Sequence, residues 1–170
     1  QMQLMGIRSV VENFSVITTG IFMSGYFTGY FLGSKTTPLL VQKVGHIRVF
    51  AAFASLASLS ALLAAVYVNP FMWTLSRFIT GISLVSCYIV TESWLNDRAT
   101  NKNRGQLLSA YFIILYTGLG IGMLLLNVSD PKNYEPFILV SVLLSLALVP
   151  ILLTKRSAPK FKKIGTISVK

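Results

Sequence analysis

The chain has 170 residues, of which 54% are hydrophobic and only 12% are charged, and its mean hydropathy is +0.68. A soluble domain carries about 25% charged residues, so this chain has too few polar groups to cover a water-soluble globule. One cysteine, Cys87, and one histidine, His46, exclude an internal disulfide and a Cys- or His-cluster metal site. The net charge of +10 does not indicate a nucleic-acid partner, because no basic face with interleaved aromatic residues accompanies it. Composition therefore indicates a protein surrounded by membrane lipid.

Five stretches are long and apolar enough to cross a bilayer as helices. Crossing a hydrocarbon core of about 30 Å takes roughly 20 mostly apolar residues in a helix. Barrel strands are about half as long as these runs and alternate in polarity, which these runs do not. We therefore predict an all-α membrane protein, a multi-span helical bundle. Its predicted parts are an external segment (1–14), five spans (about 15–34, 49–68, 71–94, 107–127 and 137–154) and a basic linker or tail (155–170).

Lysine and arginine are distributed unequally between the two ends of this bundle. The segments 35–48, 95–105 and 155–170 hold 12 of the 15 basic residues, whereas the opposite side has only Arg8 and Lys132. Cytoplasmic loops carry the excess of basic residues in membrane proteins. We therefore place these three segments on the cytoplasmic side of the cell (inner or plasma) membrane. One further span before residue 1 would restore a cytoplasmic start, so we expect a first helix to be missing from this sequence.

The connection between the first two predicted spans carries a recognisable basic motif. It resembles the signature loop between the second and third helices of the major facilitator superfamily, although Pro38 replaces its first glycine and Gln42 its aspartate. In that family the aspartate supports a charge network that locks the two halves together. We expect Gln42 to cap a helix N-terminus instead, and the alternative is an ordinary basic turn. The positions that carry the resemblance are Gln42, Lys43, Gly45, His46 and Arg48.

The third predicted span contains an arginine within an apolar run. Arg77 and Gly81 are similar to an R-x-x-x-G pattern in the fourth helix of the same family. An arginine in lipid is costly and by default marks a functional or paired site. At 100° per residue, several mostly polar residues lie on the same face of the helix as Arg77 and form a stripe. This stripe should face a cavity or the protein interior. The alternative is that Arg77 snorkels to the interface. The other members of the stripe are Thr80, Gly81, Leu84, Tyr88, Thr91 and Glu92.

Arg77 and Glu92 lie fifteen residues apart, about 22 Å along a helix, and cannot pair with each other. For Glu92 we favour a structural tie to the basic loops over proton coupling.

In the first span Gly25, Gly29 and Gly33 recur every four residues, a spacing that lets two helix backbones approach closely. The resemblance implies contact with the other half of a transporter, and the alternative is packing inside this half.

Further segments narrow the resemblance to the YcaD-type branch of the superfamily: 24–29, 45–48, 92–96, 104–105 and 109–111. It implies a partial six-helix half of that fold and a secondary active transporter, or permease, that moves a small solute by alternating access. Its implied partners are membrane lipid, a small solute, and a C-terminal six-helix half or partner membrane subunits. From Arg77 we expect the solute to be anionic. The alternative is a non-transporting scaffold or assembly subunit built from a transporter-like half.

We expect no enzymatic activity and no cofactor, because the sequence has no phosphate loop, nucleophile elbow, HExxH motif or Rossmann fingerprint. The expected substrate-cavity groups are Tyr26, Arg77, Thr80, Tyr88, Tyr111 and Tyr116. The expected conformational or packing residues are Gly25, Gly29, Gly33, Gly81, Glu92 and Arg104.

Overall fold

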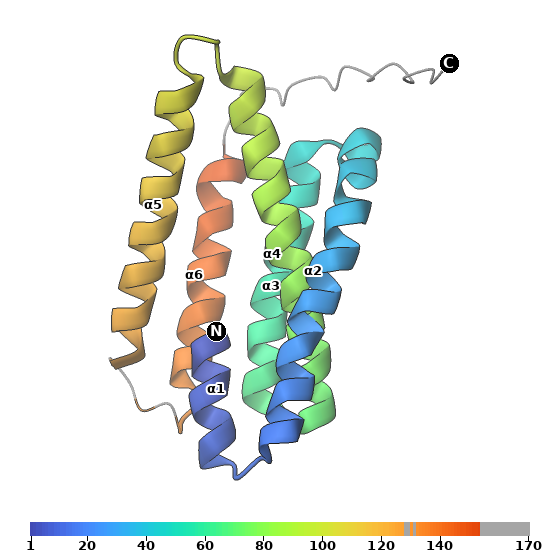
Figure 1. The fold of residues 1–170 in the computed structure, drawn as a ribbon, viewed down its shortest axis with the longest axis vertical. Helices are drawn as coiled ribbons and strands as arrows, with labels where there is room; N and C mark the ends of the chain where they lie inside the picture. The colour runs from blue at the N-terminus through green and yellow to red at the C-terminus, as the bar shows by residue number, and fades with distance from the viewer. Residues whose placement is uncertain (128–129, 131, 154–170) are drawn as a thin grey trace.

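The computed structural model describes residues 1–127, 130 and 132–153, and their regular structure is entirely helical (Figure 1). The predicted all-α class is therefore confirmed. Residues 128, 129 and 131 between the fourth and fifth predicted spans, residue 154 at the end of the fifth, and the whole of the predicted tail 155–170 lie outside the described residues. The helices are α1 (Met2–Val11), α2 (Val16–Val44), α3 (His46–Val66), α4 (Pro70–Arg98), α5 (Arg104–Leu124), the 3-10 turn η1 (Leu125–Asn127) and α6 (Glu135–Leu152).

Local sequence signals set the starts of the two longest helices. The Ser15 hydroxyl accepts a hydrogen bond from the Thr18 amide at the start of α2. The Asn69 side chain accepts one from the Phe71 amide at the start of α4, where Pro70 occupies the first turn. Side-chain oxygens at these positions satisfy amides that have no partner inside the helix, and proline is tolerated there for the same reason.

The helix α2 continues ten residues beyond the predicted first span, so the predicted loop 35–48 is wrong in its extent. Pro38 lies inside the helix and does not end it. Only Gly45 separates α2 from α3, with φ of 87°, a backbone conformation that glycine adopts without steric cost. The expected cap by Gln42 is also absent, because Gly45 itself is the N-cap of α3 and no side chain caps that helix.

The predicted external segment 1–14 is mostly helical, as α1, and packs into the bundle. Leu4 and Met5 join an apolar cluster with Phe22, Trp73 and Phe137 from three other helices. The Trp73 ring nitrogen donates to the backbone oxygen of Ala64, so this polar group is satisfied inside the apolar cluster. The cluster ties one end of the bundle together.

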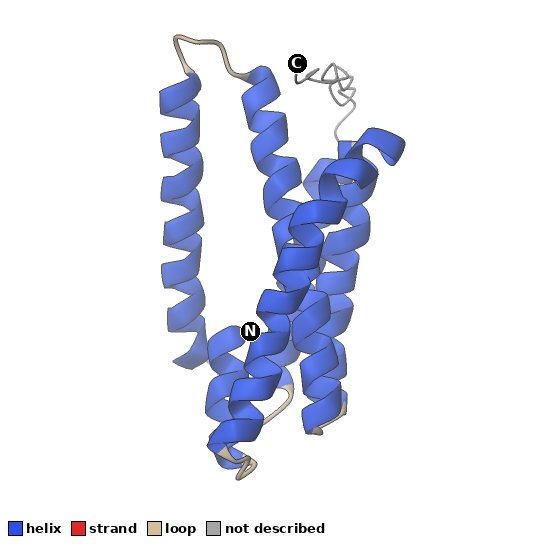
Figure 2. Ribbon diagram, turned by 45° about the vertical axis from the view of Figure 1, so that its right-hand side comes forward, coloured by secondary structure: helices blue, strands red, loops and turns tan. Residues whose placement is uncertain are grey.

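The helix α4 forms the centre of the bundle. It packs along α2 on one side and against α3 on another, and α6 packs on α3. The helix α5 stands apart over most of its length and has no buried residue (Figure 2). The helix α4 therefore has densely packed neighbours in α2 and α3, whereas α5 is only loosely attached beside it.

Hydroxyl groups join neighbouring helices at several buried positions. Such bonds satisfy polar groups that would otherwise face hydrocarbon, and they help to hold membrane helices together by about 1 kcal/mol each. The pairs, with the distance between the two hydroxyl oxygens, are Thr37 and Ser86 (α2–α4, 2.6 Å), Ser60 and Thr80 (α3–α4, 2.8 Å), and Ser58 and Ser141 (α3–α6, 2.7 Å).

Four of the described helices are long and apolar enough to cross a membrane: α3, α4, α5 with the following turn, and α6. The helix α2 has 29 residues, but its glycines, hydroxyl groups and tyrosines lower its hydropathy. Large apolar side chains such as Ile113, Ile114 and Leu124 of α5 are more than half exposed. An exterior this apolar suits lipid and would be a liability in water.

Candidate solute-binding site

The position of the site depends on an unusually close contact between α2 and α4. A side chain at Gly29 would overlap the backbone carbonyl of Phe78, and one at Gly81 would overlap the carbonyl of Tyr26. At Gly25 an added Cβ would lie 2.9 Å from the Thr74 carbonyl oxygen. The two backbones therefore touch, which only glycine permits. Of the two interpretations of the α2 glycines, this geometry favours packing inside this half.

The contact brings Tyr26 of α2 over Arg77 of α4. The guanidinium carbon lies 4.7 Å from the centre of the Tyr26 ring. A cation over an aromatic face is stabilised by about 2 kcal/mol when both groups are desolvated. Only 1% of Arg77 is exposed, so this side chain does not snorkel to an interface. The Tyr26 ring thus packs against the buried guanidinium and stabilises its charge.

Two donors of Arg77 remain unused. Its Nε and Nη2 atoms are buried and have no hydrogen-bond partner in the described part of the chain. The ion pair between Arg8 and Glu12 lies at the far end of α1. An unpaired buried donor costs about 1–3 kcal/mol, and more when the group is charged. A buried guanidinium with two free donors is the strongest indication of a ligand in this molecule.

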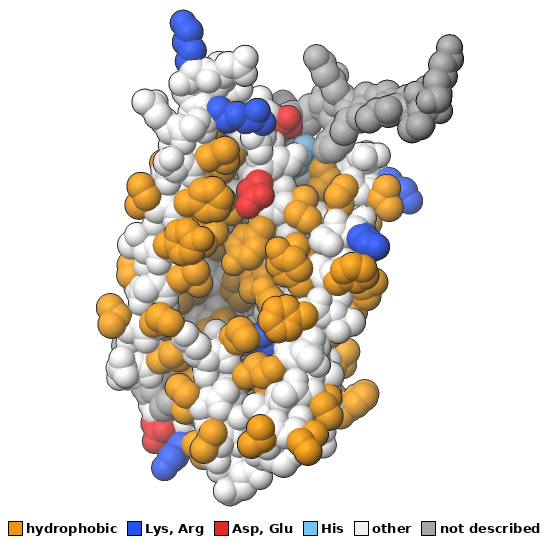
Figure 3. Space-filling model, viewed as in Figure 1, with side chains coloured by type: hydrophobic (Ala, Val, Ile, Leu, Met, Phe, Trp, Pro, Cys, Tyr) orange, Lys and Arg blue, Asp and Glu red, His pale blue; other side chains and the backbone are white. Residues whose placement is uncertain are grey.

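Arg77 lines a cavity of about 560 Å³ between α4 and the neighbouring helices. This volume lies within the range of about 300–1,000 Å³ that small-molecule sites occupy. Figure 3 shows a hollow on this face surrounded by hydrophobic side chains. Polar groups from three helices line the cavity: Gln1, Gln3, Tyr26, Arg77, Thr80 and Tyr88.

Thr80 sits one turn from Arg77 in a small hydrogen-bonded group. Its hydroxyl lies 2.8 Å from the Ser60 hydroxyl and 3.1 Å from the amide oxygen of Gln1. The amide nitrogen of Gln1 is buried without a partner among the described residues. This wall of the cavity therefore offers a second unused donor beside the guanidinium.

The structure separates the predicted cavity residues into two groups. Tyr26, Arg77, Thr80 and Tyr88 line the cavity together. Tyr111 and Tyr116 of α5 are not among its lining residues, and Tyr116 is 65% exposed. The helix α5 instead contributes residues that the sequence reasoning did not select for the cavity, Gly118 and Gly122 together with Leu119 and Met123. They form two adjacent pairs four residues apart, which places them on one face of the helix, and that was the available signal.

The residues that carry the resemblance to the signature loop lie away from this cavity. His46 is buried, and its Nε2 atom lies 3.1 Å from the Ser93 hydroxyl of α4. Gln42, Lys43 and Arg48 are exposed. His46 thus joins α3 to α4 at one end of the bundle, and none of these four residues lines the cavity.

Two further predicted packing residues lie near the end of α4. Glu92 is exposed, and its backbone oxygen accepts a bond from the Asn96 side chain. Arg104 at the start of α5 donates from Nε and Nη2 to the Asn96 side-chain oxygen, at 2.9 and 2.8 Å. Asn96 therefore connects α4 to α5 across the turn, a connection in which Arg104 takes part and the Glu92 carboxylate does not.

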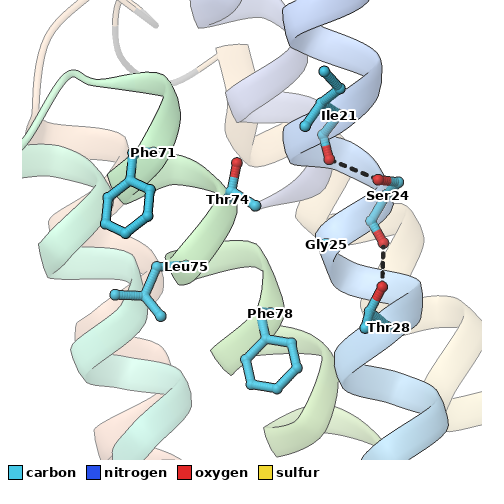
Figure 4. A pocket seen from close by; sticks show the side chains of 8 residues that line it. All are labelled: Ile21, Ser24, Gly25, Thr28, Phe71, Thr74, Leu75 and Phe78. Carbon is cyan, nitrogen blue, oxygen red and sulfur yellow. Dashed lines mark hydrogen bonds between the residues drawn. The ribbon is translucent and has the colours of Figure 1, made fainter.

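A second, smaller hollow of about 340 Å³ lies between α2 and α4 and shares no lining residue with the first (Figure 4). Its hydroxyl groups already bond within their own helix: Ser24 donates to the Ile21 oxygen at 2.7 Å, and Thr28 donates to the Ser24 oxygen at 3.5 Å. Its other lining groups are Gly25, Thr74 and apolar side chains. With no charged group, it is a weaker candidate for a solute site.

Comparison with known proteins identifies a family over nearly the whole chain. The model of the Major Facilitator Superfamily matches residues 4–167. An uncharacterized MFS-type transporter YcaD from Escherichia fergusonii is 27% identical over 158 residues, which are 93% of this chain and 41% of that relative. An uncharacterized MFS-type transporter from Enterobacter sp. (strain 638) and YcaD from Escherichia coli O6:K15:H31 are each 30% identical over 146 residues, which are 85% of this chain and 38% of each relative. No solved structure matches the chain at a significant level. The chain thus spans about two fifths of the length of these relatives.

Proposed function

Because the chain belongs to the major facilitator superfamily, we propose that it is part of a secondary active transporter that carries a small solute across the cytoplasmic membrane by alternating access. Its relatives named YcaD are MFS-type transporters, which supports a transport role. The observation that carries the proposal is Arg77, a buried cation with two unused donors at the wall of a cavity. A scaffold has no need of such a group.

The charge of Arg77 favours an anionic solute. A guanidinium binds carboxylate or phosphate oxygens through two parallel N–H···O bonds, and such charge-assisted bonds are about twice as strong as neutral ones. Nε and Nη2 lie on the same edge of the guanidinium, so one anion can accept from both. Since only 1% of Arg77 is exposed, a solute reaches this edge by displacing a neighbouring side chain.

The same proposal includes the topology of the chain. We place α2 in the membrane beside the four more apolar helices, because it packs along α4 and matches it in length. The basic end, with Lys43, Arg48, Arg98 and Lys102, faces the cytoplasm according to the distribution of basic residues. The other half of the transporter, or a partner subunit, completes the pathway.

Uptake by the full-length protein in proteoliposomes tests the proposal. Vesicles are incubated with a pool of small anions and a pool of neutral metabolites, and the vesicle contents are identified by mass spectrometry. We expect one or more anions to enter, and Arg77→Gln to reduce their uptake at least tenfold. Lys102→Gln removes the same charge from the exposed turn after α4 and should leave uptake within twofold.

The outcomes separate the two interpretations of the protein. Uptake of no solute from either pool would favour a scaffold and contradict transport. Uptake of neutral solutes alone, unaffected by Arg77→Gln, would leave transport intact and contradict the anionic substrate.

A further inference from the structure

We propose that the solute is an organic anion with one carboxylate and an apolar body, and that Gly118 and Gly122 of α5 set the size of the body that fits. This inference rests on the proposed function and specifies the solute class of the same cavity. It follows from three features of the lining: its single charge, its large apolar area, and two glycines that leave space unfilled.

The lining provides for one negative charge. Among the described side chains that line the cavity, that of Arg77 alone is charged, and no carboxylate side chain accompanies it. Its two free donors lie on one edge of the guanidinium, which matches the two oxygens of one carboxylate. A second carboxylate at the far end of the solute would enter the apolar region of α5 and α6 without a partner, at a large desolvation cost. A monoanion therefore fits and a dianion does not.

The part of the cavity lining that α5 and α6 contribute is apolar. The helices α5 and α6 contribute side chains without hydrogen-bonding groups: Leu119, Met123, Leu139, Val140 and Leu143. A sugar or another polyhydroxylated solute would leave its hydroxyl groups unpaired against this wall, whereas an alkyl or aryl body gains from the contact. The solute would then lie with its carboxylate at α4 and its apolar body toward α5 and α6.

Gly118 and Gly122 leave room for that body. Both line the cavity, they are one helical turn apart, and a Cβ built on either would have no heavy atom within 4 Å. Gly120 of the same helix is equally unobstructed but is not among the lining residues. A larger side chain at 118 or 122 would thus occupy solute space, and one at 120 would not. Because α5 has no buried residue, and leucine favours a helix more than glycine does, these substitutions should not prevent folding.

Calorimetric titration of the full-length protein in nanodiscs tests the inference, with empty nanodiscs subtracted. The probes are butanoate, hexanoate and octanoate, the amides of the same lengths, acetate, and the dianion suberate. We expect affinity to rise from butanoate to octanoate by up to about fourfold for each buried CH₂ group. Acetate, suberate and the amides should bind at least tenfold more weakly than octanoate, and Arg77→Gln should remove the preference for acid over amide.

Size selection is tested with three leucine variants. Gly118→Leu and Gly122→Leu should weaken octanoate binding at least tenfold while changing butanoate binding less than threefold, and Gly120→Leu should change neither. Equal loss in all three variants, or none, would contradict the role of the two glycines. Binding of acetate as tight as that of octanoate, or binding of none of the acids, would overturn the apolar-body inference while leaving anion transport to be judged by uptake. Equal binding of acids and amides would contradict the carboxylate at Arg77.

Discussion

Replacing Gly29 with alanine is expected to destabilise the protein by about 3 kcal/mol, because overpacking a closely packed contact costs about 1–3 kcal/mol and here the obstacle is backbone. The added methyl group would overlap the Phe78 carbonyl, which cannot rotate away as a side-chain end can. The helices α2 and α4 would have to separate, and the Tyr26 ring would move from the Arg77 guanidinium. Thermal unfolding of the purified protein in detergent measures the effect, and the variant should melt at a clearly lower temperature.

Gly20→Ala is the matched control for this prediction. Gly20 lies in the same helix with no heavy atom within 4 Å of an added Cβ. Alanine there gains up to about 1 kcal/mol of helix propensity and overlaps nothing. If Gly29→Ala and Gly20→Ala melted at the same temperature, the close contact between α2 and α4 would be wrong.

Replacing Arg77 with methionine is expected to stabilise the protein by about 2 kcal/mol and to abolish anion-dependent uptake. Methionine is apolar and removes two unpaired buried donors, each of which costs about 1–3 kcal/mol. The loss of the contact between the guanidinium and the Tyr26 ring offsets about 2 kcal/mol of that gain. Melting temperature and uptake, measured on the same preparation, should therefore change in opposite directions.

The control for this second prediction is Arg48→Met, which removes the same charge from an exposed position of α3. Surface substitutions of this kind usually change stability by less than about 0.5 kcal/mol. A lower melting temperature for Arg77→Met would mean that Arg77 supports the fold through bonds absent from this structure. The interpretation of Arg77 as a strained, ligand-directed group would then fail.

The cavity wall on α4 was predictable from sequence because it depends on helical periodicity alone. Arg77, Thr80, Leu84 and Tyr88 follow the 3.6-residue repeat, so they share a face wherever the helix packs, and all four line the cavity. The other wall was not predictable in the same way. Tyr111 and Tyr116 have suitable side chains, but their direction depends on how α5 sits beside the bundle, which no local pattern encodes.

Local breaking signals were also misleading at one end of the bundle. Pro38 and several polar residues indicated a loop, yet α2 continues to Val44. Helices extend beyond the apolar core where other helices support them, and α2 is supported by α4 through the buried bond between Thr37 and Ser86. Of these signals, only Gly45 was correct, because the backbone between α2 and α3 has a positive φ that glycine adopts without steric cost.

The charge preference of the cavity can be measured without knowing the solute. Thr80→Cys is placed in a background in which Cys87 and any other cysteine are replaced, and its rates of modification by an anionic and a cationic methanethiosulfonate are compared, each normalised to its rate with a free thiol. The position of Thr80 beside Arg77 predicts at least tenfold faster modification by the anionic reagent, and loss of that preference in Arg77→Gln. Equal normalised rates with both reagents would contradict an anion-binding cavity at Arg77.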